Sequence, residues 1–150
     1  HTNFEFVSVE PVVVMECISN LNNTNGFDVY GLNSKMIKSV ALAIVFPLTH
    51  LINESMTLGI FPSIMKVAEV IPLFKKGKLD DISNSRPISK LPVFSKIFEK
   101  IIKLQINEFF ESNNLFTNRQ FGFRHKKSTN DALLGFTESI LDSFDVGDYS

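Results

Sequence analysis

The sequence has a single cysteine, no tryptophan and no long apolar run. One thiol cannot form an internal disulfide or a metal site built from several thiolates, so Cys17 favours a reducing compartment, and we expect an intracellular protein of the cytoplasm or nucleus. The longest apolar run, residues 40–48, is far shorter than the roughly 20 residues of a membrane-spanning helix. No basic segment precedes an apolar one near residue 1, as a signal peptide would require. The sequence therefore predicts no membrane partner.

Charge is nearly balanced overall but unevenly distributed. The net charge is −1, with four acids and no base in residues 1–34 and five acids and no base in residues 128–150. Between these ends, residues 66–103 hold nine bases and four acids, and residues 119–127 hold four bases and no acid. Charges that only solvate a surface are not normally segregated so strongly. Two basic blocks are typical of a protein that binds phosphates.

The first third of the chain reads as helices joined by a turn. A hydrophobic content of 44% with fifteen phenylalanines suits one folded domain. Ser8 could cap a helix that runs to about residue 21, although the valine run inside it would also suit a strand. Residues 22–33 are rich in Asn and Gly, which predicts a turn. Apolar residues then recur at helical spacing, and we expect Pro47 to kink or split that helix and Gly59 to end it.

The middle of the chain predicts a basic β-hairpin. Residues 67–74 are β-rich and contain Pro72, which is typical of an edge strand, and residues 86–91 could be the strand that returns. Pro92 suits the first position of the next helix. The buried face of this helix is expected to carry Phe94, Ile97, Phe98, Ile101 and Phe109.

Two further signals delimit the last helices. Asn113 and Asn114 should end the helix that starts at Pro92. Ser128 and Asp131 have the spacing of a capping box, which predicts the start of a final helix. Its apolar residues, at helical spacing on one face, are Leu133, Phe136, Ile140, Leu141 and Phe144.

The first candidate site is the hairpin itself, because its basic residues would share one rim. Guanidinium groups pair with phosphates in a planar fork, and lysines act as mobile point charges. The stretch around Gly77 lacks the spacing of a phosphate-binding glycine loop, so any phosphate contact must come from side chains. A basic turn that is merely solvated remains the alternative. The residues concerned are Lys66, Lys75, Lys76, Lys78 and Arg86.

The second candidate site is QFGFR, residues 120–124, which is followed by further bases. Aromatic rings interleaved with cations suit nucleic acid, because rings stack on bases while cations meet phosphates. Equally, Phe121 and Phe123 could fill a core while Gly122 permits a tight turn. Composition does not separate these two interpretations.

Several ordered blocks of the sequence resemble one family. The blocks GIFPSIMKVAEVIPLFKKGKLDDISNSRPISKLPVFSKIFEKII (residues 59–102) and NRQFGFRHKKSTNDAL (residues 118–133) resemble the fingers side of a reverse transcriptase from a non-LTR retrotransposon. The block TNGFDVYGLNSKMIK (residues 24–38) resembles the family's first template-contacting turn. The chain departs from the family pattern at Met65, at Ser85 and at Lys90, which replaces a usual aliphatic residue.

The resemblance implies an α+β fold: the fingers and the beginning of the palm of a right-hand polymerase, helix-rich with a basic β-hairpin. Residues 1–150 would form part of a reverse transcriptase domain. In the family, hairpin bases contact the triphosphate of the incoming nucleotide, and the neighbouring turn and the QFGFR block lie beside nucleic acid. The implied nucleotide contacts are Lys75, Lys76 and Arg86, and the implied nucleic-acid contacts are Gly26, Asp28, Lys66, Gln120 and Arg124.

The family also implies partners and a cofactor. The partners would be an RNA template, a DNA primer, a deoxynucleoside triphosphate and the remaining palm of the same polyprotein. Mg²⁺ would serve the complete enzyme through two aspartate motifs, neither of which occurs in this sequence; Asp142, Asp145 and Asp148 match no ligand pattern. We therefore expect no catalytic residue, metal site or polymerase activity in residues 1–150 alone. The alternative is a non-catalytic nucleic-acid-binding or scaffold module from a decayed element.

Overall fold

The computed structural model describes residues 3–78, 81–124 and 126–146, which fall into two compact units. The first unit comprises residues 3–105 and the second lies within residues 106–146. The elements of the chain are α1 (Pro11–Ser19), α2 (Ser34–Ser39), α3 (Ala41–Leu58), the 3-10 turn η1 (Ser63–Lys66), β1 (Glu69–Phe74), the 3-10 turn η2 (Ile82–Asn84), β2 (Ser85–Lys90), α4 (Val93–Ser112) and α5 (Thr129–Val146). The mixture of helices with one small sheet agrees with the predicted α+β class.

The first helix starts later than the sequence suggested. Pro11 occupies the first turn of α1, where its missing amide hydrogen costs nothing, and Glu10 is the capping residue without a side-chain hydrogen bond. The prediction of a cap at Ser8 was therefore wrong. The valine run is helical, and Val14 is buried in the core.

The next helix breaks at Val40 and not at Pro47. Val40 ends α2 and precedes α3, with backbone angles of −108° and 11° that lie outside the helical range. Pro47 lies inside α3, and Ala43, whose carbonyl loses its helical partner there, is exposed to water. Gly59 ends α3 at φ 66° as predicted, and the amide of Ile60 donates to the carbonyl of Ser55 at 2.9 Å.

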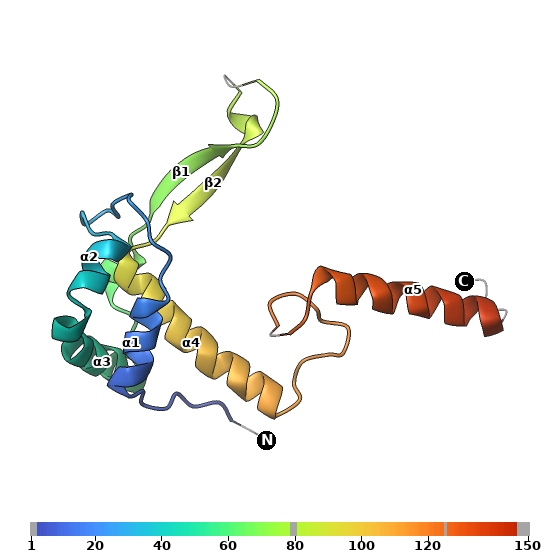
Figure 1. The fold of residues 1–150 in the computed structure, drawn as a ribbon, viewed down its shortest axis with the longest axis horizontal. Helices are drawn as coiled ribbons and strands as arrows, with labels where there is room; N and C mark the ends of the chain where they lie inside the picture. Colours follow the sequence, from blue (N-terminus) through green and yellow to red (C-terminus); the bar gives the residue numbers. More distant parts are fainter. Residues whose placement is uncertain (1–2, 79–80, 125, 147–150) are drawn as a thin grey trace. The chain divides into compact units, whose positions relative to one another are not determined.

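The core of the first unit lies between α1, α3 and the first half of α4 (Figure 1). The predicted face of α4 is confirmed for its first turns, where Ile97, Phe98 and Ile101 are buried and Phe94 is half-buried. Phe98 stacks on Phe61 with ring centroids 4.9 Å apart and planes at 11°. The buried hydrophobic residues are Val14, Cys17, Ile18, Ile37, Ala41, Val45, Leu48, Ile52, Met56, Met65, Val93, Ile97, Phe98 and Ile101.

By length and composition alone, α3 could cross a membrane. This is weak evidence, because the core helix of a water-soluble domain passes the same test. Val45, Leu48 and Ile52 of α3 are buried in the core described above.

The predicted hairpin is confirmed as a secondary structure. β1 and β2 pair antiparallel from Glu69 opposite Lys90 to Phe74 opposite Ser85, and they extend from the helical part of the first unit (Figure 1). Most of its strand residues are exposed, so its side chains are available on both faces. Pro72 lies opposite Pro87, a pairing that only a sheet of edge strands tolerates.

The second unit contains the end of α4, a connector and α5. Asn114 takes φ 54° at the end of α4, and the amide of Leu115 donates to the carbonyl of Phe110 at 2.9 Å, which confirms the predicted stop. The capping box is also confirmed, because the amide of Ser128 donates to Asp131 at 2.7 Å. The apolar face of α5 is exposed along its length; its members are Leu133, Phe136, Ile140, Leu141 and Phe144.

Candidate nucleotide and nucleic-acid interface

The tip of the hairpin is held by its own backbone and by one side chain. The amide of Lys75 donates to the carbonyl of Asn84 at 2.8 Å, and the Asn84 side chain donates to the carbonyl of Lys78 at 3.0 Å. Gly77 has φ 99°, and a Cβ there would lie 2.7 Å from the Asn84 side chain. The tip therefore requires glycine both for its backbone angle and for space.

The basic side chains beside the tip are exposed. Arg86 lies opposite Leu73 near the end of the hairpin, and Lys75 follows the last residue of β1. Neither side chain makes a hydrogen bond or ion pair with any residue in the described ranges, and the same holds for Lys76. An arginine fork and a mobile ammonium group are both groups that can bind phosphate oxygens.

Asp81, an acid in the loop of the hairpin, bonds to its neighbour Ser83. The carboxylate of Asp81 accepts from the hydroxyl of Ser83 at 2.7 Å and from its amide at 2.9 Å. These bonds lower the pKa of Asp81, the hydroxyl contributing most. Asp81 thus shapes the η2 turn while the basic side chains remain available.

The base of the hairpin is tied to the turn formed by residues 22–33. The ammonium of Lys90 donates to the carbonyl of Phe27 and lies 3.3 Å from Glu69. A Cβ on Gly26 would lie 3.9 Å from the same ammonium. The departure from the family pattern at Lys90 therefore has a structural consequence: a cation links strand and turn. Lys66 ends η1 just before β1 and is exposed.

Asp28 holds the turn against the start of α4. One carboxylate oxygen accepts from the amides of Tyr30 and Leu32, each at 2.9 Å, and the other accepts from the amide of Val93 at 2.9 Å. The residue is 8% exposed. This arrangement gives Asp28 a positioning role, and the predicted contact of Asp28 and Gly26 with nucleic acid stays a prediction.

Arg124 is engaged within the second unit. Its guanidinium forms a two-pronged pair with Glu111 at 3.1 and 2.8 Å and lies 4.8 Å from the centre of the Phe116 ring. The hydrogen bonds that Arg124 donates to the Glu111 carboxylate raise the pKa of Arg124. The side chain is only 14% exposed. This pairing was not predictable from the sequence, because Glu111 lies on α4 and Arg124 lies in the connector that follows it. Gln120 is exposed, so it is accessible to a ligand.

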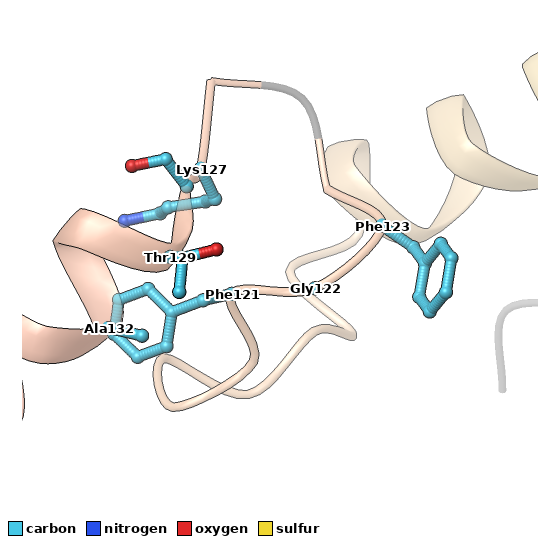
Figure 2. A pocket seen from close by; sticks show the side chains of 7 residues that line it. Phe121, Gly122, Phe123, Lys127, Thr129 and Ala132 are labelled. Carbon is cyan, nitrogen blue, oxygen red and sulfur yellow. The ribbon is translucent and has the colours of Figure 1, made fainter. Parts of the chain in front are cut away.

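The structure separates the two phenylalanines of QFGFR. The ring of Phe121 is half-buried beside Ala132 in a cavity of about 370 Å³, with the ammonium of Lys127 5.6 Å from its centre (Figure 2). Phe123 points the other way, is 93% exposed and has φ 62°, which few non-glycine residues adopt. Phe121 therefore fits the packing interpretation and Phe123 the stacking interpretation.

No group of three His, Cys, Asp or Glu side chains that could hold a metal occurs within the described ranges. Asp148 and the side chain of Asp145 lie outside those ranges. The expectation that the Mg²⁺ ligands lie elsewhere in a longer protein stays a prediction.

No family model matches the chain, but comparison of its sequence with known proteins identifies relatives. The chain is 32% identical over 149 residues to the probable RNA-directed DNA polymerase from transposon X-element of Drosophila melanogaster, covering 99% of this chain and 16% of that protein. It is 28% identical over 144 residues to the probable RNA-directed DNA polymerase from transposon BS of the same species, again covering 16% of the relative and 95% of this chain.

A third relative is the RNA-directed DNA polymerase from mobile element jockey of Drosophila melanogaster. It is 29% identical over 110 residues, which cover 73% of this chain and 11% of the relative. The predicted resemblance is confirmed, and the chain corresponds to a small part of these proteins. The alternative of a scaffold from a decayed element is not favoured, because these relatives are named as polymerases.

Proposed function

We propose that this chain, which is related to the RNA-directed DNA polymerases of non-LTR retrotransposons, forms the fingers and the beginning of the palm of such an enzyme. In this role it would contact the incoming deoxynucleoside triphosphate and the RNA template. A DNA primer and the rest of the palm would complete the site, and Mg²⁺ would be held by carboxylates beyond residue 150. The enzyme would act in the cytoplasm or nucleus, without a membrane partner.

The hairpin is the observation that carries this proposal. The turn at its tip requires Gly77, and the side chains of Arg86 and Lys75 beside it are exposed; within the described ranges no acid bonds to either. A triphosphate carries several negative oxygens, which a fork and a point charge can bind together. Lys76 supports the same role as a neighbouring cation, whereas Lys78 lies further along the turn.

The template side is supported by Phe123, Gln120 and Lys66, which are all exposed. A fully exposed ring in a basic segment can stack on an unpaired base, a contact worth about 1–3 kcal/mol per base. Arg124 would act differently from the family expectation, by holding the loop through Glu111 and Phe116. Gly26 and Asp28 would shape the turn that faces the template.

Nucleotide kinetics of a complete polymerase that contains this segment test the proposal. Arg86→Ala should raise the Michaelis constant for nucleotide and lower turnover, together equivalent to about 1.5–3 kcal/mol for a lost charged hydrogen bond. The matched control is Lys78→Ala, which should have a much smaller effect. Unchanged nucleotide kinetics with collapsed RNA affinity would place Arg86 on the template and refute the assignment.

A second experiment tests the template side. Phe123→Ala should weaken binding of a labelled single-stranded RNA by about 1–3 kcal/mol. Its control is Phe136→Ala, which removes an exposed ring from α5 without touching the basic segment. Equal losses in both variants would show that Phe123 has no specific role in RNA binding.

A further inference from the structure

The hairpin formed by β1 and β2 has few contacts that fix its angle to the helices. Every residue of β1 is exposed, and in β2 only the two end residues, Ser85 and Lys90, are half-buried. Burial of apolar side chains therefore contributes little to holding the strands against the helices. Within the described residues, Lys90 is the one side chain of the two strands that forms a hydrogen bond outside the hairpin.

Lys90 makes this bond to a part of the chain that is itself fixed. Its ammonium donates to the carbonyl of Phe27, in the turn of residues 22–33. The carboxylate of the next residue, Asp28, accepts three backbone amides, one of which belongs to Val93 at the start of α4. The acceptor of Lys90 is therefore held by a closed turn that is bonded to the helical part of the same unit.

Glu69 holds the Lys90 ammonium from the other strand. It is the cross-strand partner of Lys90, and its carboxylate lies 3.3 Å from the ammonium. The Glu69 side chain is 52% exposed, and a salt bridge this exposed contributes little stability by itself. The ammonium nevertheless joins three segments at the base of the hairpin: β2, which carries it, β1 and the turn.

A link at the base controls the position of the tip, because the hairpin is long. β1 has six residues, so at about 3.3 Å per residue it extends roughly 17 Å from its first residue to its last. A tilt of about 3–4° at the base would therefore move the tip by about 1 Å. A misplacement of about 1 Å in the groups that position a substrate can lower the rate about a hundredfold.

We propose that Lys90 is a positioning residue, which fixes the angle of the hairpin by bonding to Phe27 and so holds Arg86 where it can bind the incoming triphosphate. This inference rests on the proposed function, which assigns Arg86 to the nucleotide. The family resemblance does not supply it, because the chain departs from the family pattern at Lys90. Lys90 lies four residues along β2 from Arg86, or about 13 Å, so it acts through the hairpin and not by touching the nucleotide.

Pulsed electron-spin resonance tests the angle of the hairpin in the 150-residue chain without any measurement of activity. Spin labels on cysteines introduced at Ile82, in the loop of the hairpin, and at Leu42 of α3 would report the distance between hairpin and helices, since both positions are exposed. The background is Cys17→Ala, which removes the native thiol.

Two variants at Lys90 and one control at Glu69 give the expected pattern. Lys90→Met keeps the length of the side chain but removes the donor and the charge, and it should broaden the distribution of distances. Lys90→Arg keeps a donor for the carbonyl of Phe27 and should retain the original distribution. Glu69→Gln removes the ion pair but leaves the bond to Phe27, and it should also retain the original distribution.

Nucleotide kinetics of a complete polymerase that contains this segment test the consequence. Lys90→Met should lower kcat/KM for the deoxynucleoside triphosphate by about ten- to a hundredfold, with unchanged affinity for primed RNA, and Lys90→Arg should restore it. The matched control is Lys103→Met, at an exposed lysine of α4, which should have no effect. Because Lys90 acts through Arg86, Lys90→Met should add little to the loss caused by Arg86→Ala.

The outcomes separate this inference from the proposed function. An unchanged distance distribution in Lys90→Met, or an equal broadening in Glu69→Gln, would overturn the role of Lys90. Weakened RNA binding with unchanged nucleotide kinetics would make Lys90 a nucleic-acid contact and would also overturn it. Unchanged nucleotide kinetics in Arg86→Ala would refute the proposed function, while a broadened distribution in Lys90→Met would still show that Lys90 fixes the hairpin. Unchanged circular dichroism of the variants would show that these effects do not come from unfolding.

Discussion

Replacing Asp28 with asparagine tests whether this residue positions the turn or contacts nucleic acid. The carboxylate is nearly buried and accepts three backbone amides, two on one oxygen and one on the other. In Asp28→Asn, one acceptor oxygen becomes an amino group, which faces an amide hydrogen whichever way the side chain rotates. With the carboxamide oxygen kept on Tyr30 and Leu32, the amide of Val93 loses its partner.

The expected cost follows from that single lost bond. A hydrogen bond to a charged group contributes about 1.5–3 kcal/mol, and the buried donor left behind has no water to replace it. Asp28→Asn should therefore lower the free energy of unfolding by about 1.5–3 kcal/mol. Chemical denaturation followed by circular dichroism measures the change. Asp142→Asn, the same substitution at an exposed position of α5, should stay within about 0.5 kcal/mol.

Two results would decide against the reasoning. An unchanged denaturation midpoint would show that the carboxylate does not tie the turn to α4. Unchanged stability with weakened RNA binding would instead make Asp28 the direct nucleic-acid contact that the family resemblance implied.

Three other predictions follow from the packing, the capping box and the missing aspartate motifs. Phe98→Ala should cost about 3–5 kcal/mol of stability by denaturation, whereas Phe46→Ala, at an exposed position of α3, should cost less than about 1 kcal/mol; equal effects would refute the core assignment. Hydrogen bonds from Ser128 lower the pKa of Asp131 in the folded chain. The cap therefore stabilises α5 at pH values above the ordinary carboxyl pKa of about 3.9, and this stabilisation is lost as the pH falls through the lower pKa of the folded state. Circular dichroism during acid titration should show this loss, and Asp131→Asn should remove the dependence. The purified chain should not extend a primed RNA with Mg²⁺; labelled nucleotide incorporation would contradict this.

Local signals in the sequence predicted the ends of elements well. Gly59, Asn114 and the pair Ser128 and Asp131 act through backbone angles or through hydrogen bonds within a few residues. The hairpin was predictable for the same reason, because its strands are close in sequence. Pro47 does not split α3, because one missing hydrogen bond on an exposed helix face is tolerated, and the kink stays a prediction.

Contacts between distant residues were not predictable. Asp28 reaches Val93 across 65 residues, and no spacing rule connects a turn to the start of a helix that far away. The pairing of Arg124 with Glu111 is similar: an arginine in a basic block reads as a free cation until its partner is placed. The exposure of the apolar face of α5 was also not predictable, because helical spacing identifies an apolar face but not whether another element covers it.

The contacts of the turn at residues 22–33 connect the hairpin to α4. Lys90 ties this turn to the base of the hairpin, and Asp28 ties it to the start of α4. A displacement of the turn would therefore shift the hairpin and the start of α4 together. This gives a reason for a buried carboxylate at Asp28, since uncharged turn residues could close the loop but would leave the amide of Val93 without a charged acceptor.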